Sequence, residues 1–135
     1  MGQICTSGEI RALEDKNALT LPIKYKEFLL NGDAVFEEVM AGSDFHPPYL
    51  EKLNDWAKDL LEEDGNPCTL KVDDFVFCMH QGYQFLYFNC SEDSDDPPVY
   101  YYLEGDKSVT RVANSFTQYI AATKRSQESE SNTNN

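Results

Sequence analysis

The chain has 135 residues, of which 41% are hydrophobic and 13% aromatic, and a chain of this length suits one domain built around one core. Eleven Lys and Arg residues against 24 Asp and Glu residues give a net charge of −13. This charge repels phosphate backbones and anionic lipid headgroups, so it argues against nucleic acid or a membrane surface as a direct partner.

Targeting and metal-binding signals are weak in this sequence. No apolar run approaches the roughly 20 residues of a membrane-spanning helix, and residues 1–10 lack the basic and apolar regions of a signal peptide. We therefore expect a cytoplasmic protein. Four cysteines without a CxxC pair favour free, buried thiols over a zinc site, and we expect no metal or cofactor. They are Cys5, Cys68, Cys78 and Cys90.

Short helices are predicted in the first third of the chain. Ser7 is a suitable N-cap for a helix in which Ile10 and Leu13 lie three residues apart. A second helix starts at Pro22 and ends at Asn31, just before a glycine. The stretch 34–40 fits either a strand or a helical turn, and the residue pattern leaves the choice open.

The strongest helical pattern follows Pro47-Pro48 and stops at Gly65-Asn66-Pro67. One side of this helix is apolar and the other is charged. Its apolar stripe consists of Leu50, Leu53, Trp56, Ala57, Leu60 and Leu61.

The second half of the chain has the periodicity of strands. Two runs joined at Gln81-Gly82 predict an antiparallel hairpin, and further strands are predicted over 99–103 and 108–112. Asn114 or Ser115 can cap a closing helix. Residues 124–135 contain no apolar side chain, so we expect a disordered polar tail after a single domain spanning 1–123.

Helices followed by a meander and a closing helix are typical of an α+β domain. We expect an antiparallel meander sheet of about four or more strands, with helices packed on one side.

Catalytic patterns are scarce. Cys78 and His80 are two residues apart and share one strand face, which raises the alternative of a small Cys/His hydrolase. Same-face neighbours are separated by roughly 6–7 Å along a strand, which is too far for a base to reach its nucleophile directly. The acidic run 92–96 lacks the glycine and the closing glutamate of a calcium loop. Its simplest interpretation is a solvated loop.

Four segments of the sequence carry a resemblance. Residues 21–32 resemble the "LP..Y..FL...NG" opening of the SUKH superfamily, which includes fungal cell-wall regulators and bacterial toxin-immunity proteins. Residues 75–88 and 98–102 resemble its hairpin and "P.V" strand, and residues 115–120 its closing "SF" helix. The matched motif positions also have a structural interpretation as core and cap residues. They are Leu21, Pro22, Tyr25, Phe28, Leu29, Asn31, Gly32, Pro98, Val99 and Phe116.

The resemblance implies a SUKH-like fold without common catalytic residues. It also implies a protein that binds and neutralises a cognate intracellular toxin, often a nuclease or deaminase. The chain departs from the commoner pattern in its long acidic helix and its aromatic hairpin. A regulatory adaptor with a partner other than a toxin is the alternative in the same class.

A basic toxin domain would be bound by carboxylates and anchored by aromatic rings. Acidic residues near the end of the long helix and in the 92–96 loop, together with two strand tyrosines, are the predicted contacts. They are Glu62, Glu63, Asp64, Glu92, Asp93, Asp95, Asp96, Tyr100 and Tyr102. The opposing interpretation is that these acids only keep the protein soluble and that the tyrosines belong to the core.

Overall fold

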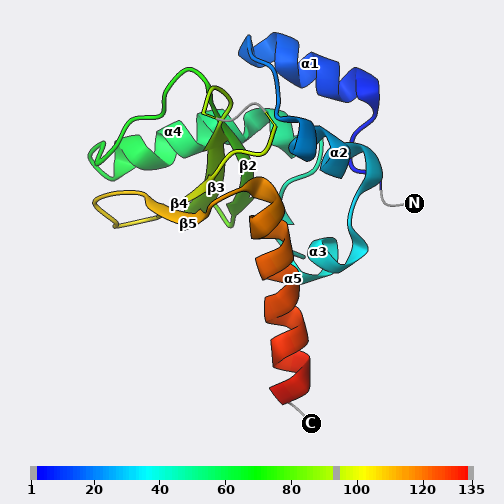
Figure 1. The fold of residues 1–135 in the computed structure, drawn as a ribbon. Helices are drawn as coiled ribbons and strands as arrows, with labels where there is room; N and C mark the ends of the chain where they lie inside the picture. The colour runs from blue at the N-terminus through cyan, green and yellow to red at the C-terminus, as the bar shows by residue number, and fades with distance from the viewer. Residues whose placement is uncertain (1–2, 93–94, 134–135) are drawn as a thin grey trace.

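The computed structural model describes residues 3–92 and 95–133 (Figure 1). Its helices are α1 (Ser7–Asn17), α2 (Ile23–Asn31), α3 (Ala34–Val39), α4 (Leu53–Glu63) and α5 (Phe116–Thr133), with a 3₁₀ turn, η1, at Tyr49–Lys52. Its strands are β1 (Ser43–Asp44), β2 (Asp74–His80), β3 (Gln84–Asn89), β4 (Val99–Leu103) and β5 (Thr110–Ala113). The strands form one antiparallel sheet in the order β1-β2-β3-β4-β5. This confirms the α+β class and the meander.

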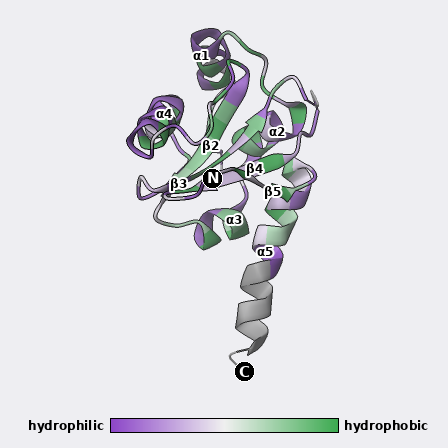
Figure 2. Ribbon diagram, turned by 90° about the vertical axis from the view of Figure 1, so that its left-hand side faces the viewer, coloured by the Kyte–Doolittle hydropathy of each residue, from purple (hydrophilic) through white to green (hydrophobic). Residues whose placement is uncertain are grey.

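Helices cover both faces of the sheet, whereas the sequence prediction placed them on one side. Figure 2 shows α4 on one side of the sheet and α2 with α5 on the other. The reason lies in β2, where both alternating sets of side chains are apolar and the first six of the strand's residues are buried. A strand of this kind has to be covered on both faces of the sheet.

Tyr25 of α2 lies at the centre of an aromatic core. Its ring centroid is 5.0 Å from that of Phe88, 5.3 Å from Phe116, 5.7 Å from Phe75 and 6.0 Å from Phe77. These rings come from two helices and two strands, so the cluster joins α2 and α5 to the sheet.

The family-motif positions have structural roles in the core and at the ends of helix α2. Leu21, Tyr25, Leu29, Val99 and Phe116 are all at most 2% exposed. Among the other motif positions, Phe28 is half-buried, Pro98 is buried, Pro22 precedes the first residue of α2, and Asn31 is its last.

The helix ends follow local sequence rules with one correction. Thr6, and not Ser7, caps α1, because its hydroxyl accepts a hydrogen bond from the Glu9 amide while the Glu9 carboxylate accepts one from the Thr6 amide. α2 stops where predicted, at Gly32 with φ of 72°. Ser115 is the cap residue of α5, since its hydroxyl accepts a hydrogen bond from the Gln118 amide.

The β2–β3 hairpin is confirmed, with Gln81 and Gly82 at φ of 52° and 79° in its turn. The open stretch 34–40 forms α3. β1 was not predicted, because two residues are too short to show a period. The long helix begins at Leu53, after η1, and not directly at Pro47-Pro48.

The polar segment 124–135, expected to be disordered, is helical as far as Thr133 as a continuation of α5. No Gly or Pro interrupts residues 124–133, and the Lys124 ammonium lies 2.9 Å from the Asp33 carboxylate. α5 is nonetheless polar, and the ranges that the structure describes contain no helix both long and apolar enough to cross a bilayer.

Candidate functional site

An open groove of about 450 Å³ lies on the sheet face between the end of α3 and α5. Volumes of this order are typical of ligand and side-chain binding sites. Among the residues that the structure describes, no Asp, Glu, Lys or Arg lines it, although 26% of the chain is charged. Its main apolar lining residues are Val39, Met40, Leu86, Val112 and Tyr119. The groove therefore suits uncharged groups.

The candidate dyad, Cys78 and His80, lines this groove. Both side chains hydrogen-bond to the same third residue, Ser43. The Ser43 hydroxyl lies 2.9 Å from Nδ1 of His80 and also hydrogen-bonds the Cys78 thiol. Burial, with a smaller contribution from the Asp44 charge, raises the pKa of the Cys78 thiol to about 12. The thiolate is the nucleophilic form, so a pKa this high disfavours Cys78 as a nucleophile near neutral pH.

The remaining cysteines are free thiols with raised pKa values. Burial is the first cause in each case. Burial and the Glu9 charge raise the pKa of Cys5 to about 11. Burial and the charges of Asp73 and Asp74 raise the pKa of Cys90 to about 12. The pKa of Cys68 is also raised. No cluster of three or more His, Cys, Asp or Glu suited to a metal ion occurs in the described part of the chain.

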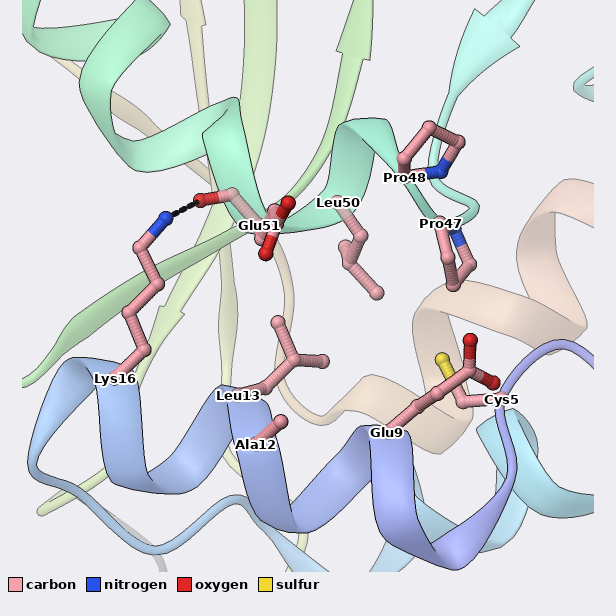
Figure 3. A pocket seen from close by; sticks show the side chains of 9 residues that line it. All are labelled: Cys5, Glu9, Ala12, Leu13, Lys16, Pro47, Pro48, Leu50 and Glu51. Atoms are coloured by element: carbon pink, nitrogen blue, oxygen red, sulfur yellow. Dashed lines mark hydrogen bonds between the residues drawn. The ribbon is translucent and has the colours of Figure 1, made fainter.

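A second hollow of about 220 Å³ lies between α1 and the Pro47-Pro48 segment (Figure 3). Lys16 donates a hydrogen bond to the Glu51 carbonyl at 2.7 Å and closes one end. At the other end the Glu9 carboxylate lies beside Cys5 and accepts the hydrogen bond from the Thr6 amide. The Lys16–Glu51 hydrogen bond holds α1 against η1, so the hollow is a structural seam.

The predicted contacts Glu92 and Tyr100 are bound to each other. The Tyr100 hydroxyl donates to the Glu92 carboxylate at 2.9 Å, and the tyrosine ring stacks on Tyr87 at 5.5 Å. Burial first, and then the Glu92 carboxylate, raise the pKa of Tyr100. Glu92 is exposed and Tyr100 half-buried, so a partner could reach both. Asp93 lies outside the described residues.

Asp95 and Asp96 hold the same loop against two helices. The Asp95 carbonyl accepts a hydrogen bond from the Lys24 amide at 2.9 Å, and the Asp96 carboxylate accepts one from the Thr117 amide at 2.9 Å. Asp96 thus lies at the N-terminus of α5, where a carboxylate stabilises the helix. Both residues have structural roles that the sequence did not reveal.

Tyr102 and Asp64 form an internal pair. Tyr102 is fully buried, so the prediction of an accessible aromatic contact is wrong at this position. Its hydroxyl donates to the Asp64 carboxylate, which also accepts from the Gly105 amide at 2.9 Å. These two hydrogen bonds, in this order, lower the pKa of Asp64. The pair ties the end of α4 to the β4–β5 turn.

Glu62 and Glu63 are exposed at the C-terminal end of α4, as expected for surface contacts. They line a surface patch with Asp59. Asp95 and Asp96 instead lie beside the starts of α2 and α5, away from the end of α4. Sequence reasoning missed the aromatic residues beside α4, Tyr49 at 48% exposure and half-buried Trp56, whose rings are 6.1 Å apart. The sequence pattern had assigned Trp56 to the apolar stripe.

The fold defines an α+β domain with a five-stranded antiparallel meander and helices on both faces. The model of the SMI1 / KNR4 family (SUKH-1) matches residues 4–122, so the chain belongs to this family. Neither the curated proteins nor the solved structures include a match.

Proposed function

We propose that the chain is a non-catalytic protein-binding module, an immunity protein that binds and neutralises a cognate intracellular toxin of the nuclease or deaminase type. Family membership over residues 4–122 supports this class of function. The observation that carries the proposal is the charge of −13 on a folded exterior.

A nuclease cleft is basic because it receives phosphate groups. Carboxylates on a rigid scaffold compete for such a cleft and raise the rate of association by electrostatic steering. Glu62, Glu63 and Glu92 are exposed on the protein and available for this purpose. The proposal requires no chemical step.

A regulatory adaptor with a partner other than a toxin is the second candidate. The observation that favours it is the groove on the sheet face, whose lining carries no Asp, Glu, Lys or Arg. Such a groove accepts uncharged side chains from any protein partner. A Cys/His hydrolase is disfavoured, because burial keeps the Cys78 thiol protonated.

Co-expression with the protein encoded beside it tests the immunity proposal. We expect the neighbour to stop growth when expressed alone and growth to return when this chain is co-expressed. Reversing surface charge with Glu62→Lys and Glu63→Lys should weaken protection, whereas Glu38→Lys on the exposed side of α3 should weaken it less. A harmless neighbour, or toxicity that is unaffected by the chain, would show that the proposal is wrong.

A further inference from the structure

We propose that the groove between α4 and the β1 edge of the sheet binds an arginine side chain of the partner protein. The groove has a volume of about 250 Å³. Its acidic lining residues are Asp44, Asp59 and Glu63, and its apolar ones include Trp56, Leu60 and Met79. The inference rests on the proposed function and specifies the chemistry by which the partner is recognised.

In the described part of the chain, the carboxylates of this groove form no ion pair. Asp59 and Glu63 are one helical turn apart on α4, and like charges at this spacing destabilise a helix. Among residues 3–92 and 95–133, no Lys, Arg or His nitrogen lies within 4.0 Å of either carboxylate or of Asp44. A cation supplied by a partner would relieve this repulsion.

The position on the helix strengthens the negative potential. α4 ends at Glu63 and has no basic residue in its last turn. The C-terminal end of a helix carries partial negative charge, so acidic residues are normally unfavourable there. Asp59, Glu62 and Glu63 add to that charge instead of offsetting it, which focuses the field at this end of the groove.

An aromatic wall distinguishes the groove from a simple acidic surface. The wall is the half-buried Trp56 indole. The ring of Tyr49 does not line the groove but packs beside Trp56, with ring centroids 6.1 Å apart and an interplanar angle of 35°. Tyr49 is 48% exposed. Trp and Tyr faces attract cations through the quadrupole of the ring, and both residue types are frequent in binding hot spots.

These features together favour arginine over lysine. A guanidinium group is planar, so it stacks on an indole while its N–H groups bind a carboxylate in a bidentate manner. It is also more weakly hydrated than an ammonium group, and it therefore enters a groove with an apolar floor such as Leu60 and Met79 at a lower desolvation cost.

Trp56 is the single tryptophan of the chain, so its fluorescence reports directly on this groove. The probes are a short arginine-containing peptide, the same peptide with lysine, and the same peptide with citrulline, an uncharged analogue of arginine. We expect the arginine peptide to change Trp56 emission saturably at low salt. The lysine peptide should bind several-fold more weakly, and the citrulline peptide at least tenfold more weakly.

The double variant Asp59→Asn/Glu63→Gln should weaken binding of the arginine peptide at least tenfold. The matched control is Asp15→Asn/Glu38→Gln, which removes the same charge from exposed positions on α1 and α3 and should bind within twofold of the parent protein. Circular dichroism checks that both variants fold. An equal loss in both, equal binding of the three peptides, or an unchanged Trp56 signal would each overturn the proposal.

The peptide titration uses the purified protein without any toxin, so it is independent of the co-expression test. Peptide binding at Trp56 without protection from a toxin would refute the immunity function and leave the arginine site standing. Protection by a protein that fails the peptide test would refute the arginine site alone.

Discussion

The side chain of Asn54 on α4 binds the backbone of Val76 at the edge of β2, where its Oδ1 accepts a hydrogen bond from the Val76 amide at 2.7 Å. Its Nδ2 donates to the Asp74 carbonyl at 3.2 Å. β1 pairs only with Met79 and His80, so the Asn54 side chain satisfies two backbone groups of β2 that β1 does not reach. An edge closed in this way is protected from pairing with another chain.

We therefore predict that Asn54→Ala lowers the free energy of unfolding by about 1–3 kcal/mol, because it leaves the buried Val76 amide without an acceptor. Urea unfolding at neutral pH measures the change. Lys58→Ala, on the exposed face of the same helix, is the control and should change the free energy of unfolding by less than about 0.5 kcal/mol. Equal midpoints for parent and Asn54→Ala would contradict the prediction.

Tyr25 gives a prediction of the opposite sign. Its hydroxyl is buried and has no hydrogen-bond partner in the described structure, and burying an unpaired polar group costs free energy. Tyr25→Phe keeps the ring contacts and should raise the free energy of unfolding by about 1 kcal/mol. Tyr102→Phe is the matched control and should lower it, because Tyr102 loses its bond to Asp64. Destabilisation by Tyr25→Phe would reveal a partner for the hydroxyl.

The pairing of Asp64 with Tyr102 predicts that the free energy of unfolding depends on pH. Hydrogen bonds from Tyr102 and Gly105 lower the pKa of Asp64 below its ordinary value of 3.8, so the ionised carboxylate stabilises the fold above that pH. This contribution is lost as the pH falls through the lowered pKa in the folded state. Asp64→Asn should be less stable than the parent at pH 7, and the gap should close toward pH 2.

Urea midpoints measured from pH 7 to pH 2 test this dependence. In a Tyr102→Phe background, Asp64→Asn should show a smaller gap, since the first cause of the pKa shift has been removed. A gap that stays constant with pH would mean that the Asp64 charge does not contribute.

Thiol reactivity tests the non-catalytic interpretation. With a pKa of about 12, Cys78 holds about one thiolate per 10,000 molecules at pH 8. Iodoacetamide should leave Cys78 unmodified in the folded protein while half-buried Cys68 reacts first, and all four cysteines should react in urea. Mass spectrometry of digests assigns the positions. Rapid, selective modification of Cys78 in the folded state would favour the hydrolase alternative.

Local patterns predicted much of the secondary structure. The alternation of β2, the turn at Gln81-Gly82 and the end of α2 at Gly32 each depend on residues near in sequence, where backbone preferences and side-chain period act directly. β1 and the start of α4 were less predictable, because short elements depend on the neighbours against which they pack.

The candidate site was predicted less well. Acidity predicted Glu62 and Glu63 as partner contacts, and both are exposed. It could not separate them from Asp64 and Asp96, whose carboxylates bind distant backbone and side-chain groups. An aromatic side chain can face the core or the solvent, and the sequence did not reveal that Tyr102 of β4 is fully buried while Trp56 of α4 is half-exposed.

The sequence by itself determined the α+β class, the order of most elements and the acidic character, because periodicity, turn residues and charge are properties of neighbouring residues. The tertiary structure alone decided that helices cover both faces of the sheet, that Asn54 binds the backbone of β2, and that Asp44 of β1 joins Asp59 and Glu63 beside Trp56. Each of these depends on contacts between residues distant in the chain, and such contacts exist only after folding has brought them together.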